Sequence, residues 1–163
     1  MTLPPSCGSR ASWRSNPLVP DESLAALDPV DLTERWTTLV SSPKDARMRV
    51  LVALERADVR GFALVHPSYD PDSDQVADGE IGEFAVDPAH QRAGHGSRLL
   101  QAAVDTLIAE RTRALWWVAS TDDVLRTFVT DSGWGPDGAH RGLPMPATRR
   151  SSRSACTPRC HDD

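Results

Sequence analysis

Residues 91–97 of this 163-residue chain place two glycines and an arginine at the expected start of a helix. Because Gly94 and Gly96 lack Cβ atoms, the backbone amides beside them can curve around an anion. The first four N–H groups of a helix have no intrahelical acceptor, and the helix dipole is positive at that end. The pattern therefore predicts a phosphate or pyrophosphate site. Its residues are Gln91, Arg92, Ala93, Gly94, His95, Gly96 and Ser97.

Two common phosphate loops do not match this segment. A Walker loop requires Gly-Lys-Ser/Thr, which the chain lacks. A dinucleotide-binding fingerprint requires a third glycine three residues after Gly96, where the chain has Leu99. A simple strand-to-helix turn that contains two glycines remains the alternative interpretation.

The elements that position this loop follow from the spacing of apolar residues. Apolar residues three and four apart predict an amphipathic helix from Ser97 to about Glu110. Residues 114–118 are continuously apolar, which is typical of a strand buried on both faces. Strands are also expected at 48–54, 61–65 and 80–86, and helices at 21–40, interrupted at Pro29, and at 122–131. These elements predict an α/β fold.

Composition divides the chain into three parts. Residues 1–20 are rich in Pro and Ser and are predicted to be a poorly ordered arm, and residues 21–142 form the expected domain. Residues 143–163 are a basic tail rich in Pro, Arg and Ser, to which no regular structure is assigned. In that tail Pro144 and Pro146 obstruct strand pairing.

Charge and cysteine content narrow the function classes. Residues 21–140 carry 21 acidic and 11 basic side chains, so bulk charge disfavours nucleic acid and attracts small cations. The three cysteines lie in the flanks, and an odd count argues against a disulfide framework. Cys156, Cys160 and His161 supply at most half of a metal site, so no metal is predicted. No apolar run approaches the roughly 20 residues of a membrane span, and the N-terminus lacks a signal-peptide core, so a cytoplasmic location is expected.

The stretch from Glu80 to Leu100 resembles the cofactor motif of the GNAT superfamily of N-acetyltransferases. That motif is Gln/Arg-x-x-Gly-x-Gly/Ala after a strand that ends in Val and an Asp-Pro turn, here Val86-Asp87-Pro88. The resemblance continues through Trp116-Trp117-Val118 and from Phe128 to Gly133-Trp134, and it covers about residues 20–140.

This resemblance implies a mixed (α+β) sheet that splays between the strand ending at Val86 and the strand at 114–119, with acetyl-CoA in the gap. Backbone groups of Phe84, Ala85 and Val86 would pair with the pantetheine arm, and amides from Arg92 to Ser97 would hold the pyrophosphate. The implied reaction is acetyl transfer to a small-molecule or peptide amine by a monomer or homodimer, with no metal.

Such a reaction needs a neutral amine. An alkylammonium has a pKa near 10.4, so deprotonation at pH 7 costs about 4.6 kcal/mol unless a base removes the proton. Glu80 stands where many family members carry a glutamate and is the first candidate base. Strand alternation places Glu83, the rival candidate, on the opposite face, while Glu80 shares its face with Phe84 and Val86. For both carboxylates, simple solvation at a strand end is the alternative.

Two positions and both ends depart from the family pattern. Where the family often has Asn and Tyr, this chain has Asp122 and Val129. Asp122 is assigned to cofactor binding, with helix capping as the alternative, and Val129 cannot protonate a departing thiolate. The family's regular terminal strands are expected to be missing. These departures keep open a second class, a non-catalytic CoA-binding domain, and a third, an adaptor whose basic tail binds acidic partners.

Overall fold

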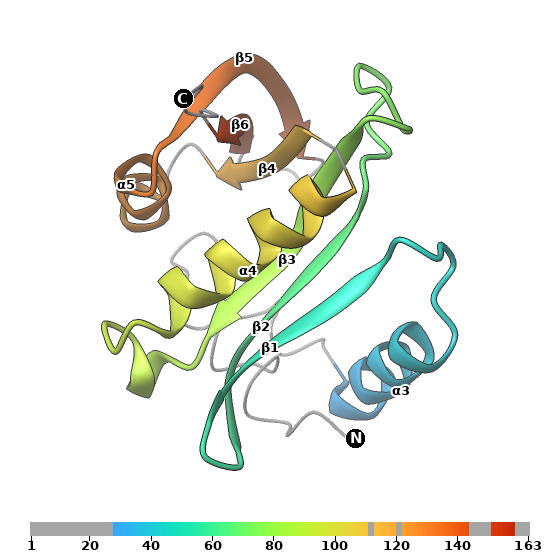
Figure 1. The fold of residues 1–163 in the computed structure, drawn as a ribbon, viewed down its shortest axis with the longest axis vertical. Coiled ribbons are helices and arrows are strands. Elements are labelled where there is room, and N and C mark those ends of the chain that lie inside the picture. Colours follow the sequence, from blue (N-terminus) through green and yellow to red (C-terminus); the bar gives the residue numbers. More distant parts are fainter. Residues whose placement is uncertain (1–27, 111–112, 120–121, 144–150, 159–163) are drawn as a thin grey trace.

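The computed structural model describes residues 28–110, 113–119, 122–143 and 151–158 (Figure 1). Six strands form one sheet in the order β1-β2-β3-β4-β6-β5. The strands are β1 (Arg49–Glu55), β2 (Asp58–Pro67), β3 (Asp78–Val86), β4 (Arg113–Ala119), β5 (Trp134–Leu143) and β6 (Ser151–Pro158). β3 and β4 are parallel and the other neighbouring strands are antiparallel, which confirms the predicted mixed sheet.

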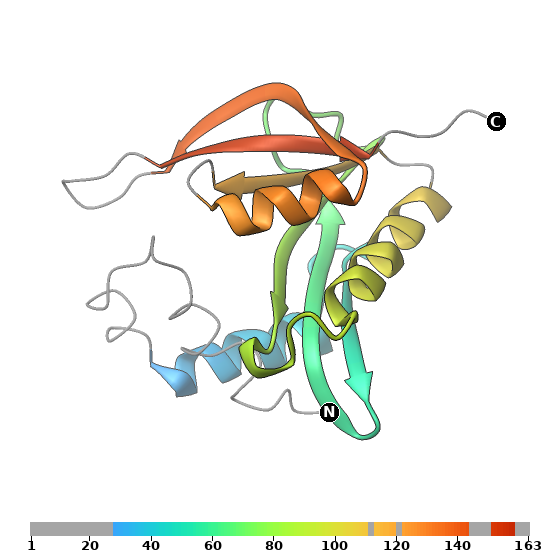
Figure 2. The same cartoon turned by 90° about the vertical axis from the view of Figure 1, so that its left-hand side faces the viewer.

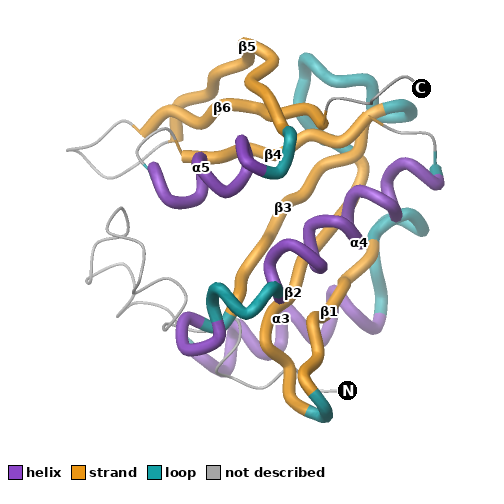
Figure 3. The backbone as a smooth tube through the Cα atoms, turned by 60° about the vertical axis from the view of Figure 1, so that its left-hand side comes forward, coloured by secondary structure: helices purple, strands orange, loops and turns teal. Residues whose placement is uncertain are grey.

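Helices cover both faces of this sheet (Figure 3). α4 (His95–Ala109) and α5 (Asp123–Asp131) pack on one face, where Leu100 and Val129 join Val65, Ile81 and Trp116 in a single core. α3 (Pro29–Ser41) covers the other face. There Trp36 packs edge to face on Phe62 of β2, with ring centres 4.7 Å apart. We call these the α4 face and the α3 face. The described helix in the first region therefore begins at Pro29, where the sequence predicted a break.

Asp28 and Pro29 account for the start of α3. The Asp28 carboxylate accepts a hydrogen bond from the N–H of Val30 at 2.8 Å, and Pro29 occupies the first turn, where no N–H donor is needed. The segment 21–27 of the expected helix lies outside the described residues.

The sheet divides into two halves between β3 and β4. These strands pair only from Asp78–Arg113 to Ile81–Trp116. Beyond that point β4 pairs with β6, whereas β3 stays with β2 alone in the described part of the chain. Figure 2 shows the two halves turning away from each other, as the family resemblance implied.

A β-bulge at Gly82 lies where the halves begin to separate. On β2, Val65 faces Ile81 and Leu64 faces Glu83, so Gly82 is the extra residue on β3. A bulge bends its strand and increases the local twist, which accounts for β3 leaving β4 directly afterwards.

An ion pair anchors the joined ends of β3 and β4. The Asp78 carboxylate is buried and accepts two hydrogen bonds from Arg113, at 3.0 and 2.8 Å, and a third from the N–H of Asp74. Hydrogen bonding to Asp78 raises the pKa of the Arg113 guanidinium. The ion pair therefore holds β3 and β4 together at the end from which they begin to separate.

The chain after Trp134 differs from the sequence expectation. β5 and β6 form an antiparallel pair, and β6 adds to the sheet beside β4, so the assignment of no structure after residue 142 was wrong. Pro144 and Pro146 lie in the segment 144–150 between the two strands, outside the described residues. Residues 1–20, predicted to be an arm, also lie outside the described residues.

Candidate active site

The predicted anion loop connects β3 to α4. Pro88–His90 form a short 3-10 turn, η1, and the Asp87 carboxylate caps it by accepting a hydrogen bond from the N–H of Ala89 at 3.0 Å. The Nδ1 atom of His90 lies 3.0 Å from the Oδ2 atom of Asp87. The hydrogen bond from Ala89 and this contact lower the pKa of the Asp87 carboxyl group. The turn reverses the chain and delivers it to the start of α4.

The loop itself uses left-handed backbone at two positions. Arg92 has φ of 64° and Gly94 has φ of 84°. Residues in the left-handed region turn successive N–H groups toward one point, which creates a concave anion site. Gly94 is required by its φ, whereas Arg92 adopts this conformation although it carries a side chain. The first hydrogen bond of α4 joins the N–H of Arg98 to the carbonyl of Gly94, which leaves the N–H groups of the preceding turn available.

Side chains at the loop separate into three environments. Gln91, Arg92, Ala93 and Ser97 are exposed, so the polar side chains among them can reach a ligand. His95 is buried on the sheet side of α4 and therefore does not face the loop's outer surface. A Cβ on Gly96 would lie 3.6 Å from Val86 and 3.7 Å from Phe128, so the glycine keeps this narrow space open.

Arg98 is a cation near the loop that the sequence interpretation did not include. Its Nη2 atom lies 3.6 Å from the position of a Cβ on Gly94. The signal was available, because a residue four positions after the cap lies one helical turn above it.

The loop and the splay share the α4 face. Phe84 packs against Trp116, with ring centres 4.9 Å apart, and against Phe128, with ring centres 6.2 Å apart. These contacts lie where β3 and β4 separate. Within the described residues, the pairing of β3 with β4 ends at Ile81–Trp116, and Phe84 to Val86 pair only with β2. Phe84, Ala85 and Val86 thus lie between the start of the gap and the anion loop.

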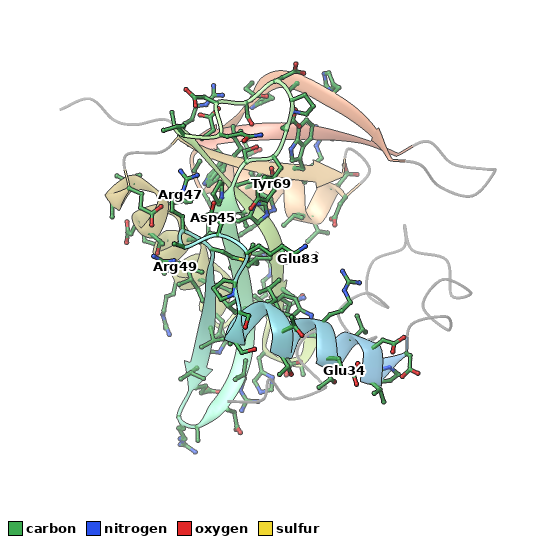
Figure 4. The ribbon with its side chains drawn as sticks, turned by 90° about the vertical axis from the view of Figure 1, so that its right-hand side faces the viewer. Glu34, Asp45, Arg47, Arg49, Tyr69 and Glu83 are labelled. Carbon is green, nitrogen blue, oxygen red and sulfur yellow. The ribbon has the colours of Figure 1, made fainter. Side chains whose placement is uncertain are left out.

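Glu80 and Glu83 both lie on the α3 face. Glu80 faces His66 across the strand pair, and Glu83 faces Leu64, both on the side opposite to Val65 and Ile81. The prediction that the two glutamates point in opposite directions was wrong, as was the grouping of Glu80 with Phe84 and Val86. Simple alternation fails because Gly82 inserts one residue, and an isolated glycine within a strand is the signal that could have shown it. Figure 4, which looks onto this face, shows Glu83 between α3 and Tyr69.

Glu80 is held in a buried position. Its side chain is 8% exposed, and its Oε2 atom accepts a hydrogen bond from the hydroxyl of Ser68 at 3.1 Å. Ser68 is itself fully buried, and its Oγ atom accepts from the N–H of Asp70 at 3.4 Å. The carboxylate therefore has a defined orientation at the beginning of the splay.

A histidine and a tyrosine complete the α3 face of the splay and were not identified from the sequence. His66 stacks on Tyr69 with ring centres 5.2 Å apart and an interplanar angle of 13°. Tyr69 is the single tyrosine of the chain and is half exposed. No local motif marks either residue, because His66 meets Glu80 only through strand pairing and Tyr69 is placed by its stack on His66.

The two departures from the family pattern have clear positions. Asp122 caps α5 through a hydrogen bond from the N–H of Leu125 at 3.0 Å, as the alternative interpretation expected. Its assignment to cofactor binding stays a prediction. Val129 is 1% exposed and packs in the core with Trp116 and Trp134. Trp117 is buried as well, in agreement with the predicted strand that is buried on both faces.

In the ranges that the structure describes, no helix has the length and apolar character of a membrane-crossing segment. No three His, Cys, Asp or Glu side chains come together as metal ligands within those same ranges.

Comparisons with known proteins agree with this geometry. A mycothiol acetyltransferase from Kineococcus radiotolerans is 34% identical over 90 residues, which are 55% of this chain and 28% of that protein. The chain therefore matches little more than a quarter of the length of this relative.

Solved structures share the fold. YncA from Salmonella typhimurium, determined with its cofactor acetyl-CoA, is 18% identical, with a TM-score of 0.61 over 80% of this chain and 73% of that one. The PaiA N-acetyltransferase from Thermoplasma acidophilum, in complex with coenzyme A, is 13% identical, with a TM-score of 0.65 over 92% and 87%.

The sequence family can be assigned as well. The profile described as the Acetyltransferase (GNAT) family matches residues 14–129, which is well over half of the chain. This match includes β1 to β4, the anion loop and nearly all of α5. The chain belongs to the GNAT family of acetyltransferases.

Proposed function

We propose that this protein transfers an acetyl group from acetyl-CoA to an amine by direct attack on the thioester. The observation that carries the proposal is the continuity of the anion loop with the open edge of β3. The left-handed backbone at Arg92 and Gly94 lies directly after the strand that leaves β4 at Gly82. The solved neighbours with acetyl-CoA or coenzyme A support this ligand at the level of the fold.

The residues present fit this co-substrate. The amides from Arg92 to Ser97 would hold the pyrophosphate, with Gln91, Arg92 and Arg98 beside them. Backbone groups of Phe84, Ala85 and Val86 would pair with the pantetheine arm along the part of β3 that lies beyond its pairing with β4. Gly96 supports this fit, because its missing side chain leaves the space between the loop and Val86 open.

When bound, acetyl-CoA supplies an activated acyl group on a thiol of ordinary pKa near 8.5, which leaves without the help of a strong acid. The protein's task is to bind a cationic amine and remove its proton. Glu80 and Glu83 give the α3 face of the splay two carboxylates close to the point where the strands separate. We propose that they attract the ammonium group, and their role as the base stays a prediction.

A non-catalytic CoA-binding domain is the competing function, and the buried Val129 motivates it. Such a domain would bind acetyl-CoA without steady release of coenzyme A. Thiol release from acetyl-CoA in the presence of a panel of small and peptide amines separates the two functions.

Thermal unfolding with acetyl-CoA tests the binding site. A ligand that binds only the native state stabilises it by about 2.7 kcal/mol at a hundredfold excess over Kd, so the Tm should rise. The Gly94→Val, Gly96→Val double variant should lose this increase, because the side chains disturb the left-handed turn and fill the space beside Val86.

The matched control is Gly138→Val. Gly138 has φ of 87°, with nothing within 4 Å of a Cβ, so this variant introduces the same backbone strain far from the loop. It should unfold at a lower temperature than the wild type and keep the full acetyl-CoA increase. An unchanged increase in the double variant would contradict the loop assignment.

A further inference from the structure

We propose that His66 is the general base that removes the proton from the acceptor amine, an inference that rests on the proposed acetyl transfer. His66 lies on β2, and the family pattern drew attention only to β3 and the loop. Three observations support it: the contact of its Nδ1 atom with a carbonyl oxygen, the position of its Nε2 atom and the groups around the ring.

The hydrogen bond of Nδ1 determines the tautomer. Nδ1 lies 2.7 Å from the carbonyl oxygen of Pro67. A carbonyl oxygen can only accept a hydrogen bond, so Nδ1 must carry the proton. In the neutral ring the lone pair is then on Nε2, which is the form required of a base.

The position of Nε2 coincides with the start of the splay. A Cβ built on Gly82 would overlap with Nε2 and would lie 2.9 Å from the ring carbon Cδ2. Nε2 therefore occupies the space that a side chain at the bulge would fill. β3 separates from β4 at this residue, so an amine that approaches the gap from the α3 face meets this nitrogen.

Titratable and charged groups from several elements face this ring. On β3 they are Glu80, the cross-strand neighbour of His66, and Glu83 after the bulge, and the stacked Tyr69 comes from the following loop. Arg47, which precedes β1, and Glu110, at the end of α4, line the same small pocket as His66, and Glu110 forms an ion pair with Arg49 at 3.7 Å. The two carboxylates of β3 beside the imidazole favour a cationic acceptor.

Imidazole suits proton removal at neutral pH better than a carboxylate. The ordinary pKa of histidine is about 6.5 and that of glutamate about 4.3, and a base works best when its pKa lies near the operating pH. Glu80 is also engaged with Ser68, which favours a role in attracting the ammonium.

The step balances without another reactant. The ammonium gives one proton to Nε2, and the amine lone pair forms the bond to the thioester carbonyl carbon. The C–S electron pair leaves with sulfur, and the second proton passes from the nitrogen to the thiolate. His66 then releases its proton to the solvent.

Affinity labelling tests the position of Nε2 without turnover. Bromoacetyl-CoA carries an alkylating carbon next to the thioester, and peptide mass spectrometry of the full-length protein should locate the adduct on His66. Excess acetyl-CoA should prevent labelling, and His66→Asn should abolish it.

Kinetics of the same variant test the chemistry. In His66→Asn the amide nitrogen can still donate to Pro67, but no atom replaces Nε2. We expect kcat/KM for the amine to fall by about a hundredfold or more near pH 7, with the loss shrinking toward the amine's pKa, and an unchanged KM for acetyl-CoA. Glu80→Gln should mainly raise KM for the amine, and His140→Asn, at an exposed histidine on β5, should match the wild type.

The outcomes separate this inference from the proposed function. If acetyl-CoA raises the Tm but the adduct forms on Glu80 or Glu83, that carboxylate is the base and the inference is overturned. His66→Asn with activity within twofold of the wild type at pH 7 overturns it as well. If acetyl-CoA neither raises the Tm nor prevents labelling, the proposed function fails and this inference fails with it.

Discussion

At the scale of single residues, Val129, where the family resemblance implied a tyrosine, is part of the core. Its side chain is 1% exposed and belongs to the same core cluster as Trp116 and Trp134. Val129→Tyr should therefore overpack the core and lower the free energy of unfolding by about 1–3 kcal/mol, without supplying a proton donor. Chemical denaturation measures this loss.

Val124→Tyr on the same helix is the matched control, since Val124 is 82% exposed. Its effect should stay within about 0.5 kcal/mol. A stable Val129→Tyr protein with a higher rate of acetyl transfer would show instead that this position still faces the reacting groups.

At the scale of elements, the bulge in β3 determines which residues share a face. Gly82→Ala should leave the fold nearly unchanged, within about 1 kcal/mol, because Gly82 has no left-handed backbone and the contacting atoms belong to a side chain that can rotate. The added methyl should nevertheless displace the His66 ring. We therefore expect kcat/KM to fall while KM for acetyl-CoA stays the same.

Gly61→Ala provides the contrast on the neighbouring strand. A Cβ there would lie 2.7 Å from the carbonyl oxygen of Ala85, so backbone must move and stability should fall more than in Gly82→Ala. If Gly82→Ala kept the NMR signals of the His66 ring and full activity, Nε2 would not occupy the bulge in solution.

At the scale of the whole molecule, the charge of the domain should govern the choice of acceptor. Residues 21–140 have 21 acidic and 11 basic side chains, β5 and β6 add Arg141 and Arg153, and the whole chain keeps a net charge of −5. Surface attraction is screened over about 8 Å at physiological salt. KM for a diamine should therefore rise several-fold between low and high salt, as steady-state kinetics would measure.

An amine of similar size that carries a carboxylate is the control, because its two charges largely cancel. Its KM should change little over the same salt range. Equal salt dependence for the two acceptors would mean that the negative field of the domain does not contribute to binding.

Local features were predictable because neighbours in the chain determine them. The anion loop, the amphipathic helix after it and the buried strand at 114–118 all appear where the spacing of glycines and apolar residues places them. The helix begins two residues earlier than expected, at His95. Capping of α5 by Asp122 belongs to the same class, since the donor is three residues away.

Features that depend on pairing between distant segments were not predictable. Alternation placed Glu83 opposite to Glu80, and the bulge at Gly82 reversed that result. The tail has no apolar alternation, yet residues 151–158 pair with both β4 and β5, because neighbouring strands supply their hydrogen-bond partners.

The sequence by itself determined the family, the anion loop and the order of most elements, because glycine conformation, helix termini and apolar periodicity act over a few residues. Only the tertiary structure decided which side chains share a face of the sheet. The pairing of β2 with β3 places His66 over Gly82 and both glutamates on the α3 face, across separations of more than ten residues along the chain. Register between strands is set by core packing and by bulges together, and one inserted residue changes the face of every residue on one side of it.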